Sequence, residues 1–285
     1  YTAAGERDSD FNIDFIGENG CNNLIDTSSN TKEKSIRRNA SINFVENLTS
    51  EKTNISGENI IFFRAWEKNL KHLVFGYSED GQNCRVAIGT TLKKAQVRRV
   101  KTKIISGTPY LFILGSWKQG GFLKIVNLNT MGSETTTDCK TCRFKNVNNF
   151  DINNEGTLIY FARYGGVFSV PVTSKGDSFE VSKGDAVTYC SHNNSPNLAN
   201  QMMNAVDVMI DPDDSNVAYI TSNVSHSIQK INPNTCVVET YIGKGAKSTT
   251  SNDGVSGSLL GDVVGFNNPS YIFVDSEKVL VGSQS

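Results

Sequence analysis

Short apolar runs separated by polar and glycine-rich stretches recur along the chain, and they predict β-strands. The apolar cores of five predicted strands cover residues 73–75, 111–113, 158–161, 217–220 and 279–281. The 24 glycines and many Asn, Ser and Thr residues interrupt any 3.6-residue period before it extends over two turns. The pattern therefore predicts an all-β fold with few or no helices.

Four of these cores are followed by a turn and a second apolar strand, which predicts β-hairpins. The predicted turns are 79–81, 120–121, 165–166 and 223–225, and the second strands are 85–88, 122–126, 167–170 and 228–231. Gly and Asn tolerate the positive φ that tight hairpin turns require. Segments 149–156 and 208–214 add a preceding strand that ends in an acidic turn. Such repeated units predict a β-propeller with four-stranded antiparallel blades, as one domain over residues 1–285.

Charge and hydropathy exclude some partners and leave others open. The formal net charge is -1, which does not favour nucleic acid as a partner. No apolar run approaches the roughly 18 residues of a membrane helix, so direct membrane insertion is not expected. The sequence starts at Tyr1 without an apolar targeting segment. We therefore expect a processed or truncated part of a longer chain, whose remainder is itself a candidate partner.

Cysteines and glycosylation sequons favour a secreted or cell-surface protein. The six cysteines, all disulfide candidates, are Cys21, Cys84, Cys139, Cys142, Cys190 and Cys236. Their even number leaves the pairing open. The five Asn-x-Ser/Thr sequons begin at Asn39, Asn47, Asn54, Asn193 and Asn223. Together they predict a disulfide-containing glycoprotein, and a cytosolic protein with reduced thiols is the alternative.

Residues 204–282 resemble the NHL-repeat type of β-propeller. The motifs that carry the resemblance are VMID at 208–211, VAYI at 217–220, HSIQKI at 226–231, YIGKG at 241–245, FNNP at 266–269 and IFVD at 272–275. Asp211 and Asp275 occupy equivalent places, as do Asn204 and Asn268. Residues 58–173 share only the strand rhythm.

The resemblance implies a propeller of six blades, closed by the N- and C-terminal segments. Residues 1–5 resemble the strand at 241–245 that ends a blade, and we expect residues 279–282 to pair with chain that is not continuous with them. Relatives of this type include calcium-dependent lactonases, alkaloid-condensing synthases and a zinc-dependent amidating lyase. The calcium candidates implied here are Asp151, Asn153 and Asp211, with Asn154 and Asp207 of suitable type.

Other catalytic signals are weak. His72, His192 and His226 do not form a paired metal-binding motif, so the zinc chemistry of the lyase is not expected. Cys139 and Cys142 have C-x-x-C spacing but no second pair, which favours disulfides over a zinc site.

A basic stretch is the most distinctive charge feature. It comprises Lys93, Lys94, Arg98, Arg99, Lys101 and Lys103. A heparan sulfate chain or an acidic protein could bind such a stretch, whereas the alternative is a solvated strand whose cations discourage edge pairing.

We therefore predict a secreted or cell-surface binding module that recognises a protein or glycan and is not catalytic, without a required cofactor. Loops within 174–185 and 247–263 are the expected contact regions. One alternative is a calcium-dependent, lactonase-like hydrolase with its metal in the central channel. Another is a structural module of a larger adhesin or receptor.

Overall fold

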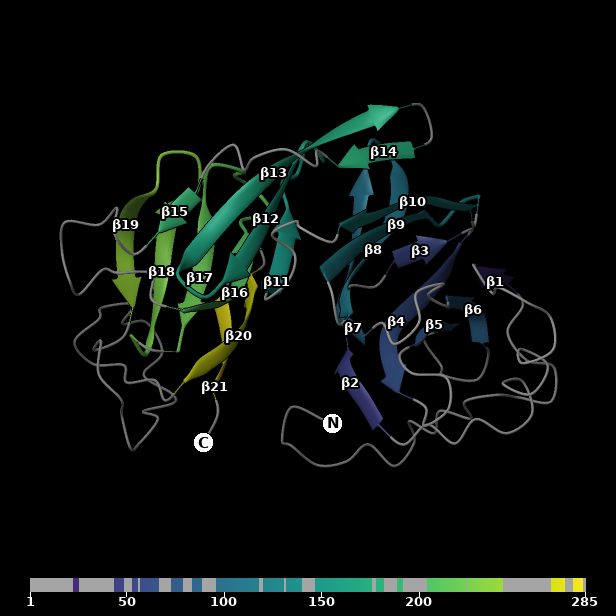
Figure 1. The fold of residues 1–285 in the computed structure, drawn as a ribbon, viewed down its shortest axis with the longest axis horizontal. Helices are drawn as coiled ribbons and strands as arrows, with labels where there is room; N and C mark the ends of the chain where they lie inside the picture. Colours follow the sequence, from purple (N-terminus) through teal and green to yellow (C-terminus); the bar gives the residue numbers. More distant parts are fainter. Residues whose placement is uncertain are drawn as a thin grey trace. The chain divides into compact units, whose positions relative to one another are not determined.

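The structure is a computed structural model. It describes residues 23–25, 44–48, 53–55, 57–66, 73–78, 84–88, 96–117, 120–130, 132–139, 147–175, 178–181, 189–191, 204–223, 225–242, 268–274 and 279–283. These residues form strands and turns without a helix, so the all-β prediction is confirmed for them (Figure 1). A helix able to cross a membrane is accordingly not found in these ranges. The chain divides into two compact units, residues 1–141 and 142–285.

The described residues of the first unit form two sheets. The first sheet has the order β1-β6-β5-β4-β2, and β3 pairs with the other half of β4. Its strands are β1 (Asn23–Ile25), β2 (Phe44–Leu48), β3 (Thr53–Ile55), β4 (Glu58–Trp66), β5 (Leu73–Ser78) and β6 (Cys84–Ile88). The second sheet is an antiparallel meander of β7 (Gln96–Ile105), β8 (Thr108–Trp117), β9 (Gly120–Asn127) and β10 (Gly132–Cys139).

The core of the first unit lies between these two sheets. Side chains alternate between the faces of a strand, so every second residue points to the same layer. Phe62 and Val74 from the first sheet cluster with Val100, Leu111 and Ile113 from the second, and all five are nearly or fully buried. At Gly76 the strands leave no room for a side chain, because an added Cβ would lie 2.6 Å from Cε1 of Phe62.

In the part of the second unit that the structure describes, three sheets are formed, each a run of neighbouring antiparallel strands (Figure 1). The first is β11 (Val147–Ile152), β12 (Leu158–Arg163), β13 (Gly166–Lys175) and β14 (Ser178–Val181), with β15 (Tyr189–Ser191) also on β13. The second is β16 (Ala205–Ile210), β17 (Ala218–Ser222), β18 (Ser227–Asn232) and β19 (Val237–Ile242). The third is β20 (Pro269–Val274) with β21 (Val279–Ser283).

These three sheets stack in chain order. One face of the middle sheet, with Val208 and Ile220, packs in a buried cluster that includes Tyr160 and Ala162 of the preceding sheet. Met209 on its opposite face clusters with the third sheet. The residues of the third sheet in that cluster are Ile272 and Val274, with Phe273, Val279 and Val281 partly buried beside them. Each of these two sheet boundaries therefore contains a buried apolar cluster.

The first strand of four sheets begins with the same irregularity. The pairing register shifts by one residue between Val97 and Arg99, Val147 and Asn149, Ala205 and Asp207, and Pro269 and Tyr271. A bulge adds one residue to one strand and increases the local twist. Its recurrence makes β7, β11, β16 and β20 equivalent strands, and we call them the inner strands.

The structure confirms the predicted strands and corrects two of the turns. Four of the five apolar cores and all four second strands lie in β-strands, and the remaining core, 217–220, does so from Ala218 onward. Gly120 and Gly121 belong to β9, because Gly120 already pairs with Trp117. Gly166 begins β13 and pairs with Arg163, so the turn between them consists of residues 164–165. The glycines therefore do mark the hairpins, but the turns lie one or two residues earlier than predicted.

The expected closure of the propeller by the N- and C-terminal segments involves residues that the structure does not describe. Residues 1–5 lie beyond the described ranges. Among the described strands, β21 pairs with β20 alone. Sheets of six, four, five, four and two strands are seen here, so four-stranded units, six blades and their closure stay predictions.

We predict that Gly76→Ala destabilises the first unit by about 1–3 kcal/mol, because Phe62 is fully buried and cannot yield without repacking. Urea unfolding would measure the loss. The matched control is Gly282→Ala, whose Cβ would meet Tyr271 at an ordinary 3.4 Å. Equal stability of the Gly76→Ala variant and the parent would contradict the tight packing.

Candidate functional site

Asp207 joins all three sheets of the second unit through one buried carboxylate. It lies on the inner strand β16 and is only 3% exposed. Its Oδ1 accepts hydrogen bonds from the Asn149 side-chain amide on β11 and from its own neighbour, Val208 N, at 2.8 Å. Its Oδ2 accepts from Ile272 N on β20 at 3.0 Å. The carboxylate therefore satisfies polar groups of three consecutive inner strands.

A second pair of acceptors repeats this arrangement two residues further along the inner strands. Asp151 Oδ2 accepts a hydrogen bond from Ile210 N at 2.7 Å. At the equivalent place in the next sheet, Met209 Sδ accepts from Val274 N at 3.1 Å. In both cases the acceptor on one inner strand binds a backbone amide of the following one. A carboxylate and a thioether thus occupy the same structural position.

The calcium candidates Asn153 and Asp211 lie in equivalent turns that follow inner strands. Asn153 Oδ1 accepts from Thr157 N at 2.8 Å and Leu158 N at 2.9 Å. Asp211 Oδ1 accepts from Asp213 N at 2.9 Å, and its Oδ2 lies 3.4 Å from the donor hydroxyl of Tyr219. Asn and Asp commonly close turns in this way.

Each of the three calcium candidates therefore has a structural hydrogen-bond partner. Asp151 lies at the sheet boundary, whereas Asn153 and Asp211 organise turns. A group of three or more His, Cys, Asp or Glu side chains suited to a metal is not found among the described residues. Metal binding stays a prediction.

Asn204 and Asn268 are equivalent residues in front of two inner strands, as the sequence comparison of these segments predicts. Both have left-handed backbones, with φ of 55° and 49°. Asn204 donates from Nδ2 to Asn223 Oδ1 at 2.6 Å. Asn268 N donates to Nδ1 of His226 at 3.2 Å, which makes this nitrogen of His226 an acceptor. His226 is thus part of the connection between the second and third sheets.

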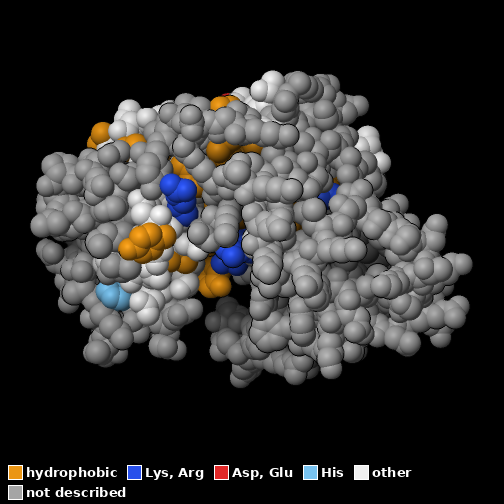
Figure 2. Space-filling model, viewed as in Figure 1, with side chains coloured by type: hydrophobic (Ala, Val, Ile, Leu, Met, Phe, Trp, Pro, Cys, Tyr) orange, Lys and Arg blue, Asp and Glu red, His pale blue; other side chains and the backbone are white. Residues whose placement is uncertain are grey.

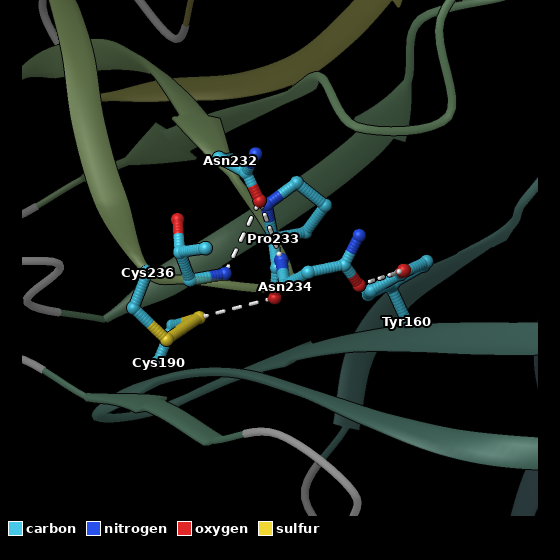
Figure 3. Close-up of a disulfide and its surroundings, with 7 residues drawn as sticks. Tyr160, Cys190, Asn232, Pro233, Asn234 and Cys236 are labelled. Carbon is cyan, nitrogen blue, oxygen red and sulfur yellow. Dashed lines mark hydrogen bonds between the residues drawn. A yellow bond between two sulfur atoms is a disulfide. The ribbon is translucent and has the colours of Figure 1, made fainter.

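A disulfide links the first and second sheets of this unit (Figure 3). Cys190 on the short strand β15 is bonded to Cys236 in the turn between β18 and β19, with the two Cα atoms 5.1 Å apart. Cys190 is 1% exposed, and its sulfur lies 3.5 Å from the Pro233 carbonyl oxygen. This bond joins two of the six candidate cysteines. Cys21 and Cys142 lie outside the described residues, and the side chains of Cys84 and Cys139 are not described.

Tyr160 joins the same two sheets beside the disulfide (Figure 3). Its hydroxyl donates to Asn234 Oδ1 at 3.1 Å. Burial, followed by the nearby charge of Glu155, raises the pKa of Tyr160 to about 12. The hydroxyl therefore keeps its proton near neutral pH and remains a donor.

The basic stretch forms part of the inner strand β7. Arg99, Lys101 and Lys103 share one face by strand alternation and are half-buried. Arg98 lies at the bulge and donates from Nε to Ser116 Oγ at 3.0 Å. Burial, followed by the charge of Arg99, lowers the pKa of Arg98. Lys93 and Lys94 lie beyond the described ranges.

The described cations do not form one continuous patch on the face that Figure 2 shows. Lys and Arg side chains lie there in separate places, with apolar side chains nearby.

Sequence reasoning did not find Asn149 and Met209 as sheet-joining residues. Asn149 is one of several Asn residues in a polar stretch, and Met209 reads as an ordinary core position in an apolar strand. The signal that identifies them is the bulge that aligns the inner strands, which places Asn149 with Asp207 and Met209 with Asp151.

No family model matches the sequence, and no curated protein matches it. A protein of Bacteroides uniformis assigned as a 6-phosphogluconolactonase is similar at 15% identity and TM-score 0.45, over 66% of this chain and 52% of that one. Hsv2p of Kluyveromyces lactis is similar at 10% identity and TM-score 0.33, over 70% of this chain and 64% of that one. The chain thus spans about half of the first protein and less than two thirds of the second. Similarities this low carry no argument about activity or ligands.

We predict that Asp207→Ala lowers the free energy of unfolding by about 3 kcal/mol, because Ile272 N and the Asn149 amide lose their buried acceptor. Urea unfolding would measure it. Asp207→Asn keeps one acceptor oxygen, so its free energy of unfolding should fall by less than that of Asp207→Ala. The exposed Asp213→Ala is the control and should change stability by no more than about 0.5 kcal/mol. A similar loss in the Asp207→Ala and Asp213→Ala variants would contradict the joining role of Asp207.

We predict that removing the disulfide frees β15 locally, because a three-residue strand has few bonds of its own. In a Cys190→Ser/Cys236→Ser variant, amide hydrogen exchange at residues 166–168, which pair with β15, should accelerate at least about tenfold, or about 1.4 kcal/mol. Residues 172–174 of the same strand pair with β14 and serve as the internal control. Equal acceleration in both segments would indicate global destabilisation instead.

Proposed function

We propose that the chain forms part of a β-propeller and acts as a non-catalytic, extracellular module that binds a protein or glycan. The observation that carries this proposal is the use of the buried inner-strand acceptors. Asp151, Asp207 and Met209 accept hydrogen bonds from the next inner strand, so they serve the scaffold. Recognition is then left to groups other than these acceptors, namely the loops that the scaffold positions and the cationic face of β7.

The stacking of the sheets supports the propeller. Within the second unit the sheets follow one another in chain order, each beginning with a bulged inner strand, and the successive inner strands β11, β16 and β20 are linked directly. A propeller is a radial repetition of such units, in which each sheet buries its faces against its neighbours. The finer proposal is six four-stranded blades of the NHL type, closed by the terminal segments.

The disulfide supports the extracellular location. Disulfides persist in oxidising compartments and are rare in the cytosol. The Cys190–Cys236 bond connects two sheets, and Cys190 is fully enclosed. An oxidising extracellular environment would preserve this covalent link between neighbouring sheets.

We propose that the partner is anionic and contacts the cations of β7. Lys101 and Lys103 are half-buried and lie on one face, two residues apart, which corresponds to roughly 7 Å along a strand. Sulfate or carboxylate groups of an acidic glycan or an acidic protein face have the charge to match them. Arg98 serves the bulge through Ser116 instead.

We predict that Lys101→Glu and Lys103→Glu each weaken retention on immobilised heparin, because each reverses a charge in the proposed contact. Elution should shift to lower salt by a measurable step, since phosphate- or sulfate-like contacts are screened by salt. Lys230→Glu, a reversal of the same size on β18, is the matched control and should elute like the parent.

The result that would contradict the proposal is equal retention of all three variants and the parent.

A calcium titration distinguishes the hydrolase alternative from the binding module. A ligand that binds only the folded state stabilises it by about 2.7 kcal/mol at 100 times its Kd. A calcium-dependent rise in Tm that Asp151→Asn abolishes would favour the hydrolase.

A further inference from the structure

Two of the five glycosylation sequons have side chains that the structure describes, and their surroundings differ. Asn54 lies on β3 and is exposed. Asn223 lies at the end of the β17–β18 hairpin and is half-buried. A sequon marks an acceptor in sequence, but a glycan needs a solvent-facing side chain in the folded protein.

The hairpin of β3 and β4 points Asn54 outward. The residues on either side of it, Thr53 and Ile55, are buried at 2% and 8% exposure, so strand alternation places Asn54 on the opposite, open face. Ile55 pairs with Glu58 across a tight turn, in which Gly57 has φ of 85°. Gly57 is the residue type that accepts this conformation without strain.

The amide of Asn54 is held in a way that leaves room for substitution at its nitrogen. Its Oδ1 accepts a hydrogen bond from Gly57 N at 2.8 Å, which fixes the side chain by its oxygen. Its Nδ2 donates to Asn59 Oδ1 at 3.3 Å. An Asn side chain has two hydrogens on Nδ2, and a glycosidic link replaces one of them. Both contacts can therefore persist in the glycosylated hairpin.

Asn223 is placed differently. Its Oδ1 accepts from Asn204 Nδ2 at 2.6 Å, directly before the inner strand β16. Ser225, the third residue of this sequon, is half-buried with its hydroxyl 2.7 Å from that of Ser227. A sugar on Asn223 would have to fit beside the start of an inner strand.

We propose that Asn54 carries an N-linked glycan. This inference rests on the extracellular location in the proposed function. In the transfer, Asn54 Nδ2 forms a bond to C1 of an oligosaccharide, the bond from C1 to a lipid diphosphate carrier breaks, and Nδ2 loses one proton. The glycan covers the open face of the β3–β4 hairpin, so the partner of the module binds elsewhere.

The test is expression of the full chain behind a secretory signal in glycosylating eukaryotic cells. Peptide-N-glycosidase in heavy-oxygen water converts each glycosylated Asn to labelled Asp, which peptide mass spectrometry locates. We expect the label at Asn54 in the parent. Asn54→Gln should lose it together with the corresponding intact-mass shift, and Asn223→Gln should retain both.

Ser56→Ala is the second variant, because it removes the sequon and keeps the Asn54 side chain with its contacts. It should also lose the label, with a Tm close to that of the parent. Secreted chain with unlabelled Asn54 would overturn this inference alone. Failure of the signal-bearing chain to be secreted, with no label at any sequon, would overturn it together with the extracellular location.

Discussion

The second unit depends on one constraint: the backbone amides of buried inner strands must find acceptors. Among the described strands, each inner strand has a paired neighbour on only one side, and a buried amide without an acceptor costs about 1–3 kcal/mol. Here the acceptors come from the preceding sheet, as with Asp151 for Ile210 N and Asp207 for Ile272 N. Since Asp151 and Asp207 each bind one particular backbone amide of the next inner strand, these bonds help to fix how the neighbouring strands align.

This constraint also limits what the inner strands can do chemically. Carboxylates at Asp151 and Asp207 look available for a metal in the sequence, yet both hold neighbouring backbone in the structure. Asn153 and Asp211 are similarly used to close turns. Polar residues that resemble catalytic candidates therefore have structural hydrogen-bond partners in the described part of the chain.

Strands and hairpins were predictable because their signals are local. The apolar core of β12 lies within a few residues of Gly165 in the following turn and of Gly166 at the start of β13, and the preference of Gly for positive φ acts at that range. The exact position of the turn between β8 and β9 was harder to predict, since a glycine such as Gly120 fits equally well in the turn or as the first paired residue of the next strand. Strand β10 (Gly132–Cys139) was missed because GSETTTDC contains no apolar alternation, and its place depends on pairing with β9.

By itself the sequence determined the all-β class, most strand positions and the kinds of turn, because backbone preference and apolar alternation act over a few residues. Its spacing could not choose a partner for Cys190, nor show that Asn149 and Asp207 would meet, since these pairs are separated by 46 and 58 residues. Only the tertiary structure decided those contacts. Stacking the sheets in order brings distant groups together, and the need to satisfy buried amides then assigns a role to each polar side chain.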